Sequence, residues 1–107
     1  MDVVQTTQVG DRTEIRLVGR LGVSEAAAAQ RRLDVALAQQ RPVSLDATKL
    51  NGVDTAGLQL LAAFYRAAHL RELNPQWIEA SAALREGARL LGLEALLNLE
   101  PARNVQR

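Results

Sequence analysis

The sequence predicts a single α/β domain in which a mixed β-sheet is covered by helices. Segments with the two-residue periodicity of strands alternate along the 107 residues with segments that have the apolar spacing of helices. Strands separated by such helices imply parallel neighbours, because parallel strands need a long crossover connection. The length is sufficient for one hydrophobic core and too short for two.

Two short strands are expected near the N-terminus, over residues 3–7 and 13–18, with Gly10 and Asp11 forming the turn between them. Within residues 13–18, apolar and charged side chains alternate. One face of the sheet should therefore contact solvent.

The first helix is expected over about residues 25–39, where Ala, Leu, Gln and Arg give a high helix propensity. Ser24 precedes it and is a residue type favoured at the N-cap. The helix should end before Pro42, which opens a short central strand over residues 42–46. We expect the next residues, 47–53, to form a loop.

The longest helix is expected over residues 55–70, where apolar side chains recur at three- and four-residue steps. A strand over residues 76–80 and a helix over residues 81–91, with Ser81 as its N-cap, follow. For residues 93–99 the pattern leaves open a last strand or a half turn of helix.

Composition excludes several classes of function. The net charge is +1 and the arginines are scattered, so a surface for nucleic acid is not expected. Cysteine is absent, which excludes thiolate catalysis and cysteine-based metal sites. The chain lacks a signal peptide and a run of ~20 apolar residues, so we expect a cytoplasmic protein without direct membrane insertion. Residues 1–100 should form the domain and residues 101–107 a loose tail.

The most informative motif, NGVDTAGL, spans residues 51–58, at the entry to the longest helix. Asp54 is a good N-cap, whereas Gly57 in the first turn costs up to ~1 kcal/mol relative to Ala. The missing side chain should serve a close approach, either of the domain body or of a partner. The motif is therefore either a cap with a packing glycine or a site that presents Thr55 as a phosphoacceptor. A phosphate would act beside Asp54 and beside Asp46, which we expect at the same edge of the sheet.

Other candidates for chemistry are weaker. His69, the only histidine, has no neighbouring ligands at metal spacing. Thr55 has no histidine or lysine within its motif to act as a base. We therefore expect no catalytic residue, no metal and no cofactor. Trp77 lies on a predicted strand and is expected in the core.

Residues 43–47 and 53–61 resemble the signature of STAS domains, the family that includes bacterial anti-sigma-factor antagonists. In that signature a buried strand ends in Asp, here Asp46, and a loop leads to Asp-Ser/Thr-Ser/Thr/Ala-Gly-Leu at the start of a helix, here DTAGL. The resemblance implies the STAS fold, a mixed four- to five-stranded sheet covered by helices on one side.

The resemblance also implies a non-enzymatic bacterial signalling module. In the family, the residue after the motif's Asp, here Thr55, is phosphorylated by a partner serine/threonine kinase of the histidine-kinase-like ATPase type, and phosphorylation ends the binding. Many phosphorylated members carry Ser where this chain has Thr. The implied partner-binding residues are Asp46, Asn51, Asp54, Thr55, Ala56, Gly57 and Leu58.

The identity of the partner stays open at this point. An anti-sigma factor or switch kinase is one class, and a two-component or chemotaxis protein is another, since residues 77–93 resemble small STAS proteins of those systems. The alternative is a subunit of a phospholipid-trafficking ABC transporter, whose small STAS subunit also shows DTAGL and would leave Thr55 unmodified. A domain that binds nucleotides or lipids has no support from a Gly-rich phosphate loop or a large apolar groove.

Overall fold

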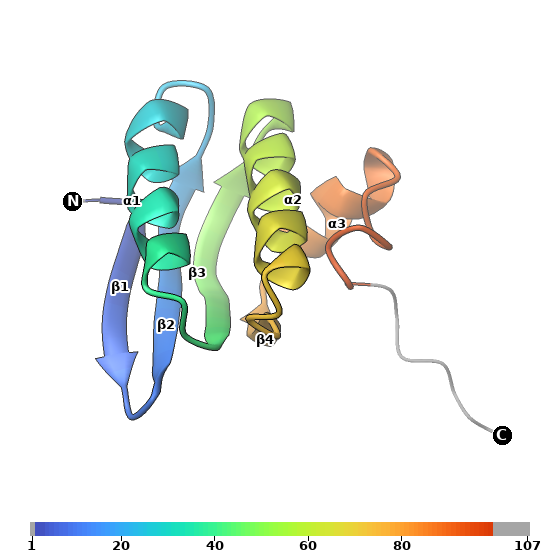
Figure 1. Cartoon of the computed structure of the whole chain (residues 1–107). Coiled ribbons are helices and arrows are strands. Elements are labelled where there is room, and N and C mark those ends of the chain that lie inside the picture. Colours follow the sequence, from blue (N-terminus) through green and yellow to red (C-terminus); the bar gives the residue numbers. More distant parts are fainter. Residues whose placement is uncertain (1, 100–107) are drawn as a thin grey trace, which may run out of the picture.

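The computed structural model describes residues 2–99, which form a four-stranded sheet and three helices (Figure 1). The predicted α/β fold class and mixed sheet are confirmed. The predicted loose tail, residues 101–107, lies outside the described residues. The elements are β1 (Val4–Val9), β2 (Arg12–Leu21), α1 (Ala26–Ala38), β3 (Val43–Val53), α2 (Thr55–Leu70), β4 (Gln76–Ala80) and α3 (Ala82–Leu90).

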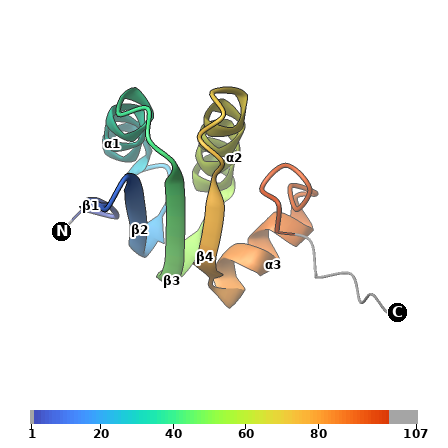
Figure 2. The same ribbon diagram turned by 60° about the horizontal axis from the view of Figure 1, so that its bottom comes forward.

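The sheet has the strand order β1-β2-β3-β4 and combines one antiparallel pair with two parallel pairs. β1 and β2 form a hairpin whose turn includes Gly10 with φ +64, a conformation that favours glycine. Each parallel pair requires a crossover, supplied by α1 and α2, and both helices lie on the same side of the sheet (Figure 2). The ends of β2 and β3 therefore meet at one edge, where α1 and α2 begin.

The core lies between the sheet and the helices. In β2, Ile15 and Leu17 are fully buried, whereas Arg16 between them is exposed on the open face. The polar face predicted from the alternation in this strand is therefore confirmed. None of the helices in residues 2–99 is long and apolar enough to cross a bilayer. The helix α2 contributes Leu58, Leu61, Phe64, Tyr65 and Ala68 to the core.

The largest difference from the sequence-based prediction is the length of β3. The strand does not end at residue 46 but runs over Val43–Val53, through the segment that we expected to be a loop. At two places β3 has one residue more than β2 opposite it. Bulges of this kind let a strand continue with a local bend. Asp46 consequently lies inside a strand and not at its end.

The starts of α1 and α3 differ in how they are capped. Ser24 is not the cap of α1: the N-cap position is Glu25, and its side chain makes no capping hydrogen bond to the helix. Glu25 Oε1 instead accepts a hydrogen bond from the N–H of Gly22, at 2.9 Å. The cap predicted for α3 is confirmed, because the hydroxyl of Ser81 accepts from the N–H of Leu84 at 3.2 Å.

Residues 93–99 form turns that pack onto the core, which rules out the last strand for this segment. Leu97 is fully buried, and its carbonyl accepts a hydrogen bond from Nε1 of Trp77 at 2.7 Å. The indole stacks on the ring of Tyr65, with ring centroids 6.3 Å apart, and the Tyr65 hydroxyl accepts from Asn98 at 3.3 Å. Trp77 is partly buried beside the core, and its polar end holds this C-terminal segment.

Candidate functional site

The candidate site lies at the edge where β2 and β3 end. β3 ends at Val53, Asp54 follows, and Thr55 is the first residue of α2. The N–H of Asp54 donates to the carbonyl of Leu21, the last residue of β2, at 3.2 Å. This bond sets the start of α2 beside the turn of residues 22–25, which leads from β2 into α1.

Asp54 ties these two loops together. Its Oδ1 accepts from the N–H of Gly57 at 3.0 Å, which confirms the predicted N-cap, and its Oδ2 accepts from the N–H of Val23 at 3.0 Å. The amides of Gly57 and Val23, in that order, hold the pKa of Asp54 below its ordinary value of 3.8, with a smaller contribution from the positive charge of Arg20. Both oxygens are engaged within the chain, so Asp54 positions the site.

The depressed pKa of Asp54 predicts a pH-dependent stability. Its contribution is fully present above pH 3.8 and is lost as the pH falls through the lower pKa of the folded state. We expect Asp54→Asn to lower the Tm at pH 7, and we expect the deficit relative to wild type to shrink below pH 3.8. Thermal unfolding followed by circular dichroism between pH 2 and 7 measures this, with Asp34→Asn, an exposed position on α1, as control. A deficit that stayed constant with pH would contradict the role given to the Asp54 charge.

Gly57 serves the packing of the domain itself. A Cβ at this position would lie 2.3 Å from the carbonyl oxygen of Leu21 and 2.9 Å from Cγ2 of Val53. Of the two uses that the sequence leaves open, the close approach of the domain body is therefore the one that the structure contains. Leu58 is only 2% exposed and belongs to the core. Neither Gly57 nor Leu58 presents a side chain to a partner in this conformation.

The residues left on the surface are Thr55 and Asn51, which are exposed, and Ala56, which is partly exposed. Val23 joins them from the neighbouring turn and is 72% exposed. The sequence did not single out Val23, because this residue belongs to no recognisable motif. Its place follows from the parallel pairing of β2 and β3, which brings the end of each strand to the same edge.

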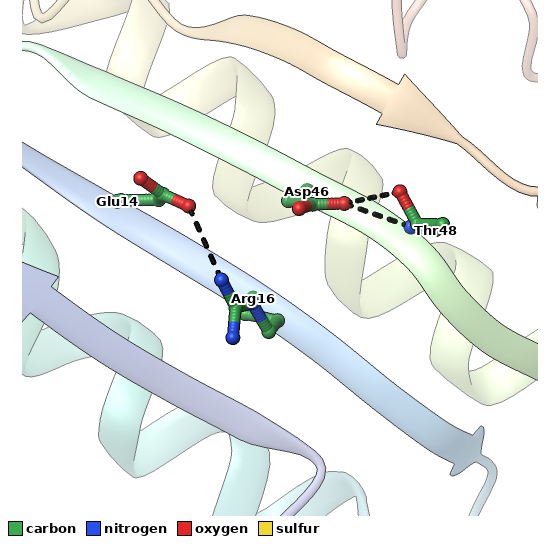
Figure 3. A network of polar contacts seen from close by, with 4 residues as sticks. All are labelled: Glu14, Arg16, Asp46 and Thr48. Atoms are coloured by element: carbon green, nitrogen blue, oxygen red, sulfur yellow. Dashed lines mark hydrogen bonds and ion pairs between the residues drawn. The ribbon is translucent and has the colours of Figure 1, made fainter.

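Asp46 lies on the open face of the sheet, opposite the helices and next to Arg16 of β2 (Figure 3). Its carboxylate accepts from the Thr48 hydroxyl at 2.6 Å and from the Thr48 N–H at 2.9 Å, and these two bonds, in that order, lower the pKa of Asp46. Beside it, Arg16 pairs with Glu14 at 3.8 Å. The extended strand after Asp46 places it roughly 20 Å from the start of α2, at about 3.3 Å per residue. The expectation that Asp46 and Thr55 share an edge is wrong.

His69 lies exposed in the last turn of α2, as expected for a residue at a helix end. Within residues 2–99, no group of three His, Asp or Glu side chains is close enough together to hold a metal ion. The polar groups at the start of α2 are therefore backbone amides, the hydroxyl of Thr55 and the carboxylate of Asp54, which already accepts two hydrogen bonds. Such an arrangement can offer a contact surface and a hydroxyl for modification.

Comparisons with known proteins agree with this architecture. A family model described as "Mlab, STAS domain" matches residues 4–99. No curated protein matches the sequence. Among solved structures, an anti-sigma factor antagonist from Mycobacterium paratuberculosis is similar with a TM-score of 0.76 and 19% identity, over 94% of this chain and 86% of that one.

Two further structures extend the comparison. The anti-sigma factor antagonist SpoIIAA in its unphosphorylated form has a TM-score of 0.64 and 20% identity, over 87% of this chain and 84% of that one. A structure of Mglu has a TM-score of 0.64 and 22% identity over 75% of this chain, which spans only 20% of the Mglu chain. At these identities the structures establish a shared fold.

Proposed function

The chain belongs to the STAS domain family, and we propose that it is a non-enzymatic signalling module that binds a partner protein at the start of α2. One observation supports the proposal above the others. Asp54, Gly57 and Leu58 are all engaged within the domain, whereas Thr55 is exposed at the first position of the helix. Thr55 is thus the residue of the motif that offers an exposed hydroxyl for contact or modification.

We further propose that Thr55 is a phosphoacceptor for a kinase of the histidine-kinase-like ATPase type. The Thr55 Oγ1 would take the γ-phosphoryl group of ATP, with ADP as the leaving group and the hydroxyl proton lost to solvent. SpoIIAA, which shares the fold, has a structure in its phosphorylated form. A phosphate adds about −1.5 to −2 charges, and the positive end of α2 tolerates them. Phosphorylation would therefore change the surface charge and leave the fold intact.

Affinity capture from native lysate tests this function with wild type, Thr55→Ala and Thr55→Glu. We expect wild type and Thr55→Ala to capture the same ATPase and Thr55→Glu to bind it at least about tenfold more weakly, a loss of ~1.4 kcal/mol in binding. Mass spectrometry should find phosphate on Thr55. Thr6→Glu is the matched control, since Thr6 is also exposed but lies on the edge strand β1, which β2 separates from β3. Equal capture by Thr55→Glu and wild type would refute the switch.

A second candidate is a subunit of a phospholipid-trafficking ABC transporter in which Thr55 contacts an ATPase subunit and is never modified. It is favoured by the structural roles of Asp54 and Gly57, which account for much of the DTAGL motif without a phosphate. Under this function, the same capture should yield transporter subunits in stoichiometric amounts with Thr55 unmodified. That result would lead us to withdraw the phosphoacceptor.

A further inference from the structure

Arg20 lies across the end of β3, next to the candidate site. It is the penultimate residue of β2 and pairs with Gly52. Because Gly52 has no side chain, that of Arg20 can lie over it: a Cβ at Gly52 would be 3.0 Å from Nη1 and 3.4 Å from Cγ of Arg20. The stem of Arg20 therefore packs on β3, and its guanidinium sits beside the strand three residues before Thr55.

The guanidinium of Arg20 has no acidic partner within the part of the chain that the structure describes. None of the ion pairs among residues 2–99 involves it, and its side chain is exposed. Its positive charge acts on Asp54, but the two oxygens of Asp54 already accept hydrogen bonds from backbone amides. The site thus combines an exposed hydroxyl at Thr55 with a cation that acts on the preceding residue, Asp54, and forms no ion pair among residues 2–99.

We propose that Arg20 receives the phosphate of Thr55 in an ion pair within the same chain, an inference that rests on the proposed function. A guanidinium can donate two parallel hydrogen bonds to phosphate oxygens, which a lysine ammonium cannot do in the same geometry. Phosphorylation then has two effects on the surface. It adds negative charge at Thr55, and it withdraws the Arg20 guanidinium, which the unmodified protein offers to a carboxylate of the partner.

The second pKa of the phosphate, ordinarily near 6, reports this ion pair directly. Three proteins that carry phosphothreonine at position 55 are titrated by ³¹P NMR: one with the wild-type sequence otherwise, one with Arg20→Gln and one with Lys49→Gln. A paired guanidinium favours the dianion, so the wild-type pKa should lie roughly 0.3–0.7 pH unit below that of Arg20→Gln. Lys49 is the matched control, because it is an exposed cation on β3 farther from Thr55, and Lys49→Gln should stay close to wild type.

Equal phosphate pKa values in wild type and Arg20→Gln would overturn the proposal. Equal shifts in the Arg20 and Lys49 variants would also overturn it, because they would reflect net charge alone. Both positions are exposed, so the variants should fold, and circular dichroism checks this. The titration needs no partner and therefore tests Arg20 separately from the proposed function. Partner capture that is unchanged by substitution of Thr55 would refute the proposed function. A phosphate pKa that is unchanged by Arg20→Gln would refute only the role of Arg20.

Discussion

Replacing Gly57 by Ala should cost about 3 kcal/mol of the free energy of unfolding and lower the Tm on the order of 15 °C. The added Cβ would meet the carbonyl oxygen of Leu21 at 2.3 Å, far inside van der Waals contact. That oxygen belongs to the last residue of β2 and also accepts the N–H of Asp54, so it cannot move without disturbing the sheet edge. The higher helix propensity of Ala returns at most ~1 kcal/mol. Thermal and urea unfolding followed by circular dichroism measure the loss.

Gly87→Ala is the matched control. Gly87 also lies inside a helix, α3, but its Cβ would be 3.0 Å from Cδ1 of Leu58, the flexible end of a side chain. A small rotation of Leu58 can relieve this contact, so we expect Gly87→Ala to stay within about 1 kcal/mol of wild type. If Gly57→Ala lost as little free energy of unfolding as Gly87→Ala, the close approach of β2 would not require a glycine at position 57. The glycine could then serve the close approach of a partner.

The elements that were predicted well are those determined by local patterns. The bounds of α2 and β4 agree with the prediction. A long run of apolar residues at helical spacing predicts α2, and a short segment between turn residues predicts β4. The N-caps Asp54 and Ser81 were also predictable, because a cap bonds to amides within its own first turn. The STAS signature then placed Thr55 at the start of the helix.

The features that escaped prediction depend on contacts between distant segments. β3 continues past Asp46 because its residues 49–53 pair with residues 18–21 of β2, and bulges absorb the extra residues. Val23 and Arg20 join the candidate site only because β2 is the parallel neighbour of β3. Residue periodicity carries no information about strand order, so neither could be named beforehand.

Leu97→Ala should cost about 3 kcal/mol of the free energy of unfolding, within the ~2–5 kcal/mol typical of large-to-small changes at buried leucines. Leu97 is fully buried, although it lies in a segment of turns, and its carbonyl accepts the indole N–H of Trp77. The substitution leaves this hydrogen bond in place, because the bond uses the backbone carbonyl, but it opens a cavity where the Leu97 side chain packs. Urea unfolding measures the loss. The fluorescence of Trp77, the single tryptophan, reports whether the segment loosens in the folded state.

Leu96→Ala is the control, because the preceding leucine is 53% exposed and should lose less than about 1 kcal/mol. The two variants remove the same atoms from adjacent positions, so the difference between them isolates burial from composition. A large loss at Leu97 alone would make residues 93–99 part of the folding unit and support our assignment of the domain up to residue 100. Equal and small losses would mean that the segment does not contribute to the core, and the domain boundary would then move to a position before residue 93.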